Sequence, residues 1–141
     1  MPESLQAAVA VILDQEGKSQ ILLTRRQQPE KPHKHNRWHL PGGAVEEGEL
    51  PSETIARELE EELTLKSFTH IAHKTVEVPN SDFNDQMTLF HLFLIATSQS
   101  ADLNITQDPD ANDIRWFELK DMAKIQSFPL VTLAIATFKL V

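Results

Sequence analysis

Cysteine is absent from the 141-residue sequence, which excludes disulfide bonds and a thiol nucleophile and agrees with a reducing compartment. Long apolar runs are absent too, since none approaches the roughly 18 residues of a membrane-spanning helix. Residues 1–4 lack the basic stretch that opens a secretory signal. We therefore expect a soluble, cytoplasmic protein with no membrane partner. With 40% hydrophobic residues, a chain of this length suits a single domain, 1–141, built on one core.

Negative charge is concentrated in one segment. The formal net charge is −8, and residues 42–63 hold eight of the 21 acidic residues but a single basic one, Arg57. The rest of the chain is nearly balanced, with 13 acidic and 12 basic residues. The absence of a general basic surface argues against nucleic acid as a partner. The local acidity instead indicates a site that binds a partner of opposite charge.

The segment just upstream has the opposite sign. Residues 25–37 contain five basic residues against one acid, and two prolines disfavour regular structure there. In an enzyme that acts on phosphates, such cations would hold the phosphate oxygens that a metal does not reach. Arg25 and Arg26 close a predicted strand and are the preferred candidates. For Lys31, Lys34 and Arg37, the alternative to phosphate binding is a place in a solvated loop with no ligand.

Apolar runs and polar breaks predict several strands and three helices. Strands are expected at 5–13, 20–24, 68–78, 87–97 and 114–117, and helices from Pro51, at 118–125 and at 129–140. The first two strands would form a hairpin, and the next two an antiparallel pair whose connecting loop borders a ligand pocket. Residues 42–50 are expected to form a glycine-containing loop.

The helix from Pro51 concentrates carboxylates on one face. At about 100° per residue it carries an apolar stripe made of Ile55, Leu59 and Leu63. Beside the stripe lie Glu58, Glu61 and Glu62. Like charges at this spacing destabilise a helix by about 0.2–0.5 kcal/mol per pair, so a bound cation would explain them. Mg²⁺ takes such hard oxygen ligands and keeps waters for a phosphate substrate. The alternative is a solvated acidic face paired with Arg57 and nearby lysines.

The complete spacing resembles the Nudix box, Gly-x5-Glu-x7-Arg-Glu-U-x-Glu-Glu-x-Gly-U, where U is aliphatic. The matching residues are Gly43, Glu49, Arg57, Glu58, Leu59, Glu61, Glu62 and Leu65. The preceding residues 38–42, Trp-His-Leu-Pro-Gly, also resemble the lead-in to that motif. The resemblance implies an α+β fold of the Nudix type, an α/β/α sandwich with a central mixed β-sheet.

The resemblance also implies chemistry, namely metal-assisted hydrolysis of a nucleoside diphosphate linked to another group. Mg²⁺, or Mn²⁺ in its place, would be held by Glu58, Glu61, Glu62, a peptide oxygen at Gly42 and a carboxylate at Asp110 or Asp113. Turn chemistry is the alternative for both aspartates. Glu58 or Glu61 would activate water. Arg57 would pair with Glu49 and orient the ligands, and Gly43 would let the backbone approach the metal.

For the substrate, the similarity is to MutT-type nucleoside triphosphatases, which implies a (d)NTP or modified NTP converted to NMP and pyrophosphate. The candidate substrate-binding residues are Arg25, Arg26, Leu40 and Thr132. Thr132 stands near the position of a purine-reading Asn and lacks its paired donor and acceptor, so a strict 8-oxoguanine preference is not expected. The chain has no Tyr, unlike many dinucleoside polyphosphate hydrolases. An ADP-ribose or nucleotide-sugar hydrolase and a non-catalytic nucleotide sensor are the alternatives, and a homodimer stays open.

Thr64 is the one departure from the motif. The usual Gly there supplies a left-handed residue at the helix end, a conformation that costs a β-branched residue about 1–2 kcal/mol. We therefore expect the helix to end differently. Activity should survive the substitution because the candidate metal ligands lie upstream of it.

Overall fold

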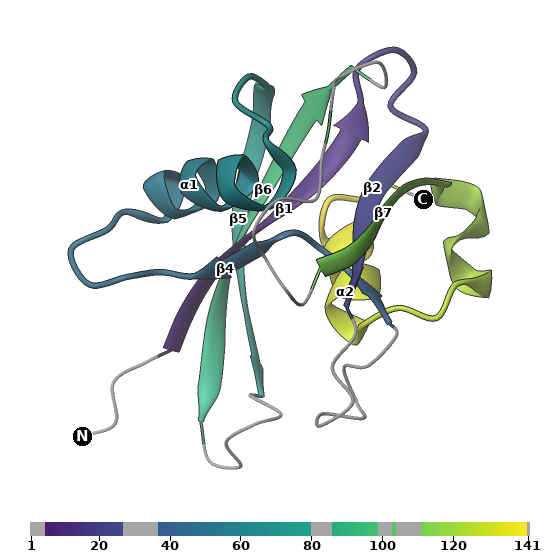
Figure 1. Ribbon diagram of the computed structural model, residues 1–141. Coiled ribbons are helices and arrows are strands. Elements are labelled where there is room, and N and C mark those ends of the chain that lie inside the picture. Colours follow the sequence, from purple (N-terminus) through teal and green to yellow (C-terminus); the bar gives the residue numbers. More distant parts are fainter. Residues whose placement is uncertain (1–4, 27–36, 80–85, 99–102, 104–110, 141) are drawn as a thin grey trace.

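The structure, a computed structural model, describes residues 5–26, 37–79, 86–98, 103 and 111–140, without the side chains of Arg26, Ala111 and Asn112 (Figure 1). Its strands form one mixed sheet of seven. They are β1 (Leu5–Asp14), β2 (Gln20–Arg26), β3 (Trp38–His39), β4 (Gly42–Ala44), β5 (Thr69–Pro79), β6 (Met87–Thr97) and β7 (Ala111–Glu118). The order is β3-β2-β1-β6-β5, with β4 also paired to β1 and β7 to β2. β1 runs parallel to β6, and the other described pairs are antiparallel.

The first hairpin is closed by a buried carboxylate. Asp14 accepts hydrogen bonds from the backbone N–H groups of Gly17 (2.8 Å), Lys18 (3.1 Å) and Gln20 (2.7 Å). Burial opposes the charge on Asp14, but these backbone donors, led by Gln20 and Gly17, lower its pKa below the usual value. The predicted hairpin is therefore confirmed, and its turn is held by one side chain.

Residues 38–44 fill a wedge that opens between β1 and β2. The two strands pair only next to their turn, at Ile12–Leu22 and Leu13–Ile21. Farther along, β3 pairs with β2, and β4 pairs with the first half of β1. The Pro41 carbonyl between them accepts from Ala10 N–H at 2.9 Å. The expectation of a loop over 42–50 was thus wrong for residues 42–44, because such short strands have no period of their own and depend on the exposed edge of β1.

Helices cover both faces of the sheet. One face packs under α1 (Pro51–Leu63), and the other under the 3₁₀ helix η1 (Leu119–Lys124) and α2 (Pro129–Thr137) (Figure 1). Successive residues of β1 alternate between two cores, with Ala8, Ala10 and Ile12 on the α1 side. Val9, Val11 and Leu13 point to the α2 side. The predicted α+β fold, an α/β/α sandwich with a central mixed sheet, is confirmed.

The apolar stripe of α1 is confirmed as well, since Ile55, Leu59 and Leu63 are all buried in the α1-side core. Pro51 occupies the first turn, and the Glu53 carboxylate accepts from the Leu50 N–H at 2.8 Å. The structure lengthens the last strand to Ala111–Glu118 and shortens the last helix to Thr137. In the described ranges, no helix has the length and apolar character needed to cross a membrane.

Thr64 ends α1 in the conformation that the sequence argued against. Its φ and ψ are 55° and 28°, in the left-handed region that Gly would occupy. Its N–H donates to Glu60 O at 3.0 Å, and the Leu65 N–H donates to Leu59 O at 3.1 Å. The Thr64 hydroxyl donates to Leu63 O at 2.6 Å, which satisfies a helix-end carbonyl. The expectation of a different helix end was therefore wrong, because these bonds offset the steric cost.

Candidate active site

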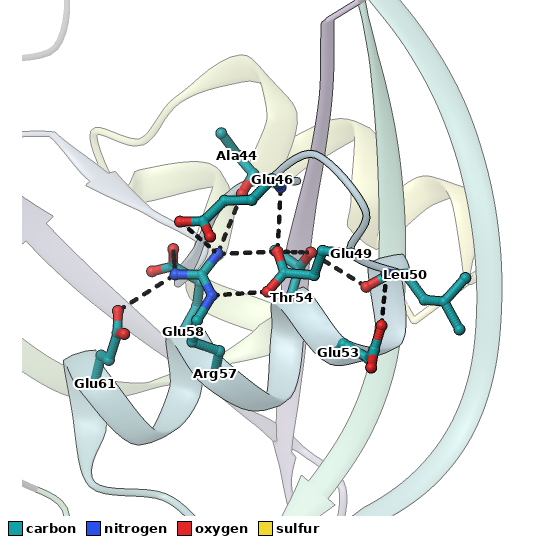
Figure 2. A network of polar contacts seen from close by, with 9 residues as sticks. All are labelled: Ala44, Glu46, Glu49, Leu50, Glu53, Thr54, Arg57, Glu58 and Glu61. Carbon is teal, nitrogen blue, oxygen red and sulfur yellow. Dashed lines mark hydrogen bonds and ion pairs between the residues drawn. The ribbon is translucent and has the colours of Figure 1, made fainter.

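Arg57 lies at the centre of a carboxylate cluster (Figure 2). Its guanidinium forms a two-pronged pair with Glu49, with Nε 2.8 Å from Oε2 and Nη2 3.1 Å from Oε1. Nη1 contacts Glu58 Oε1 at 3.0 Å and Glu61 Oε2 at 3.4 Å. Nη2 also reaches Glu46 Oε1 at 3.6 Å. Four carboxylates thus surround one guanidinium, which leaves the cluster with a net three negative charges.

Glu49 fixes the loop before α1 to the helix. Besides Arg57, it accepts from the Thr54 hydroxyl at 2.6 Å and from the Glu46 N–H at 3.1 Å. The hydrogen bonds from Arg57 and then Thr54 lower the pKa of Glu49 from 4.5 to about 2. The pair with Glu49 in turn raises the pKa of Arg57. The expected Arg57–Glu49 pair is present, and Thr54 and Glu46 are members that the motif spacing did not reveal.

The three candidate glutamates differ in exposure. The Glu58 side chain is 15% exposed and that of Glu61 60%, whereas Glu62 is 4% exposed at the edge of the buried stripe. Burial of Glu62 follows from its place between the acidic face and Leu59. Of the three, Glu58 lies against β4, where its carboxylate faces Gly43.

Two adjacent glycines of β4 allow close approach to β1 on one side and to α1 on the other. A Cβ at Gly43 would stand 2.6 Å from Glu58 Cδ, so the missing side chain provides the space that the carboxylate occupies. A Cβ at Gly42 would instead meet the backbone of β1, 2.7 Å from Val9 Cα, and the Gly42 φ of 151° also favours glycine. Gly42 therefore lets β4 approach β1, and Gly43 lets Glu58 approach β4.

These residues suit a hard divalent cation by donor type, because they offer carboxylate and peptide oxygens beside excess negative charge. Within the part of the chain that the structure describes, no three His, Asp or Glu side chains converge on one metal position. Arg57 Nη1 instead bridges Glu58 and Glu61. Asp110, a predicted ligand, lies outside the described residues.

Asp113, considered above as a metal ligand, pairs with two arginines instead. Its Oδ2 contacts Arg25 Nη2 at 3.4 Å and Arg115 Nη2 at 3.1 Å. Alternation along β7 puts Asp113 on the same side as Phe117, which packs in the α2-side core. Asp113 is therefore on the face of the sheet opposite the glutamates of α1, and metal binding beside them is not supported.

Of the predicted substrate-binding residues, Arg25, Leu40 and Thr132 lie on the α2 side of the sheet. Arg25 stacks on Trp38, with 5.0 Å from Cζ to the ring centroid, and Arg115 stacks on the same ring at 5.6 Å. Thr132 is exposed on α2. Leu40 is 3% exposed within the core, so its side chain offers little surface to a substrate and the prediction that it binds substrate is not supported. The side chain of Arg26 lies outside the description.

Comparison with known proteins gives a family. Residues 4–134 match the family model described as the NUDIX domain. The nucleoside triphosphatase NudI of Klebsiella pneumoniae (strain 342) is 32% identical over 90 residues, 60% of this chain and 64% of NudI, just under two thirds of that relative. An RNA pyrophosphohydrolase of Ruthia magnifica subsp. Calyptogena magnifica is 29% identical over 132 residues, 82% of this chain and 69% of that protein.

A solved structure agrees in fold. The C. elegans Ap4A hydrolase in a binary complex superposes with a TM-score of 0.76 over 96% of this chain and 95% of that chain, at 21% identity. At this identity the likeness concerns architecture alone. The family model, by contrast, spans the sheet and the whole of α1 with its glutamates. The chain therefore belongs to the NUDIX domain family.

Proposed function

We propose that the chain is a metal-dependent pyrophosphohydrolase that converts a nucleoside triphosphate, or a modified one, to NMP and pyrophosphate. The observation that carries the proposal is the Arg57 cluster, in which four carboxylates meet one guanidinium beside the space left by Gly43. This uncompensated negative charge favours a divalent cation. Membership of the family and the nucleoside triphosphatase activity in the name of NudI support the reaction class.

We assign the metal ligands to Glu58, Glu61, Glu62 and a peptide oxygen of Gly42, with Asp110 as a further candidate. Mg²⁺ suits these oxygens, and Mn²⁺ would substitute for it. Bound there, the ion would polarise the phosphate oxygens and lower the pKa of a water. Glu58 and Glu61 must then exchange their contacts with Arg57 Nη1 for the ion, while the two-pronged pair with Glu49 keeps Arg57 in place.

Side chains of the protein carry out the remaining steps of the reaction. Glu58 or Glu61 takes a proton from the attacking water, whose oxygen bonds to phosphorus while the bridging anhydride bond breaks and pyrophosphate leaves. Arg57 acts through the carboxylates that it holds rather than on substrate, as outer-shell partners of metal ligands do. Glu49 and Thr54 fix Arg57 from the other side.

For the substrate, we assign Arg26 to the phosphates, and Arg25 and Thr132 to the nucleoside. Arg25 pairs with Asp113 and lies over Trp38 on the face of the sheet opposite the glutamates of α1, which is the face that α2 covers. A 5′-triphosphate on RNA is the second candidate, because the Ruthia magnifica RNA pyrophosphohydrolase aligns over 82% of this chain. The net charge of −8 favours the small nucleotide.

A substrate panel tests the proposal. The purified chain is incubated with Mg²⁺ and, separately, with NTPs, oxidised dNTPs, ADP-ribose, a nucleotide sugar, a dinucleoside polyphosphate and a 5′-triphosphorylated oligoribonucleotide. Released pyrophosphate and the nucleotide product are quantified. We expect NMP and pyrophosphate from at least one NTP, with kcat/KM above that for the other classes.

Matched variants connect turnover to the cluster. Glu61→Gln should lose about 10²–10⁴ in kcat, the usual contribution of a general base. Glu60→Gln makes the same charge change on another face of α1, where Glu60 is exposed, and should keep the activity. Preferred turnover of ADP-ribose or of the oligoribonucleotide would refute the substrate assignment. Binding of nucleotides without any turnover would support a sensor instead.

A further inference from the structure

Two histidines, one on β5 and one on β6, meet on the α1 side of the sheet. His73 Nε2 on β5 lies 3.3 Å from His91 Nδ1 on β6, and His91 Nε2 lies 3.0 Å from Gln6 Oε1 on β1. In the register of the two strands, His73 is opposite Phe93 and His91 is opposite Thr75, so the imidazoles are diagonal neighbours. Phe93 belongs to the α1-side core, which fixes the face on which both rings lie.

The neighbours of the pair determine which nitrogens are available. With the Gln6 amide oriented as in the structure, its oxygen accepts the hydrogen of His91 Nε2, which leaves the Nδ1 lone pair directed toward His73. The His73 ring stacks on buried Phe93, with 4.4 Å between centroids and 1° between planes. Burial, and then the neighbouring His73, lower the pKa of His91, which favours the neutral imidazole.

We propose that His73 Nε2 and His91 Nδ1 together bind a borderline-soft divalent cation of the Zn²⁺ type, with solvent completing its coordination. Two nitrogens about 2.0–2.1 Å from a tetrahedral Zn²⁺ are about 3.3 Å apart, which is the separation of this pair. A modest tilt of the exposed His73 ring would direct both lone pairs to one ion, which replaces the hydrogen shared by the two nitrogens. Gln6 then acts as the outer partner that selects the ligating nitrogen of His91.

This site is distinct from the proposed Mg²⁺ site. Gly43, Ala8 and His91 stand opposite one another in a single row across β4, β1 and β6. At about 4.8 Å per strand, the backbone of His91 is therefore roughly 10 Å from that of Gly43. The donors differ as well, because imidazole suits Zn²⁺, Ni²⁺ and Cu²⁺ whereas carboxylate suits Mg²⁺.

Zn²⁺ titration of the full chain by isothermal calorimetry tests the site. Saturating Mg²⁺ is present to occupy the carboxylates. The variants are His73→Gln and His91→Gln, with Gln6→Leu for the outer partner. His70→Gln is the matched control, because His70 is on the same strand and near Phe93 but has no part in the pair. A double His33→Gln/His35→Gln variant controls for the other closely spaced histidines of the sequence.

The wild type should show a saturable Zn²⁺ event that His73→Gln and His91→Gln both remove, while both control variants keep it. Gln6→Leu should weaken it about tenfold or more. Circular dichroism checks the folding of each variant. If His91→Gln does not fold, Zn²⁺ binding by His73→Gln, at an exposed position, tests the site by itself. Absence of a saturable event in the wild type, or its survival in His73→Gln, would overturn the proposal.

Discussion

Gly43→Ala separates the active-site role of the glycine pair from its structural role. A Cβ at position 43 would be 2.6 Å from Glu58 Cδ, whereas carbon atoms in contact sit about 3.5–4.0 Å apart, so the carboxylate must move by about 1 Å. A misplacement of about 1 Å at a reacting centre costs on the order of 10²-fold in rate. The φ of Gly43 is not positive, and the obstructing atoms belong to a side chain rather than the backbone. Stability should therefore change little.

Gly42→Ala is the contrasting variant. Its Cβ would meet Ala8 O and Val9 Cα, backbone atoms of the central strand that cannot turn aside, and φ is 151°. We expect a loss of about 3 kcal/mol or more. At about 2–4 °C per kcal/mol, the melting temperature should fall by about 6 °C or more. Thermal unfolding and pyrophosphate release are measured for both variants. Unchanged kcat/KM in a folded Gly43→Ala, or an equal drop in melting temperature for the two, would refute the reasoning.

Two further outcomes concern Glu49 and the C-terminal end of α1. Because the pKa of Glu49 is lowered from 4.5 to about 2, its charge stabilises the fold above about pH 4.5, and this contribution disappears as the pH falls toward 2. Glu49→Gln should therefore melt below the wild type at neutral pH, and the difference should shrink over that window; a difference independent of pH would contradict this. Thr64→Gly should raise stability by about 1 kcal/mol, since it removes the left-handed strain, while kcat stays unchanged. A lower unfolding midpoint would show that the Thr64 hydroxyl bond outweighs the strain.

The parts of the site that lie close together in sequence were predictable. The spacing from Gly43 to Glu62 determines which side chains share a helix face, and the expected Arg57–Glu49 pair is present. The contacts of Glu46 and Thr54 with the cluster were not predictable, because they depend on how the loop 45–50 folds back on α1. The left-handed conformation of Thr64 was not predictable from its intrinsic backbone preference, because that preference does not include the hydrogen bonds that the helix end supplies.

Features that depend on distant strands were not predictable. β3 and β4 are two and three residues long and exist because β1 and β2 diverge and expose backbone groups. The sequence predicts a strand that begins at Ile114 and therefore puts Asp113 in the loop before it. Pairing with β2 extends that strand, and only then does alternation put Asp113 beside Arg25 and Arg115. The His73–His91 pair likewise requires the register of β5 on β6.

The central claim is that Glu58 and Glu61 bind a divalent cation, and Mn²⁺ titration followed by electron paramagnetic resonance tests it directly, independently of any substrate. Protein-bound Mn²⁺ loses the sharp signal of the free ion, so bound and free metal are counted at each concentration. Glu58→Gln and Glu61→Gln should each weaken the site about tenfold or more, while Glu60→Gln should titrate as the wild type. Equal Mn²⁺ affinity in all four proteins would contradict the account.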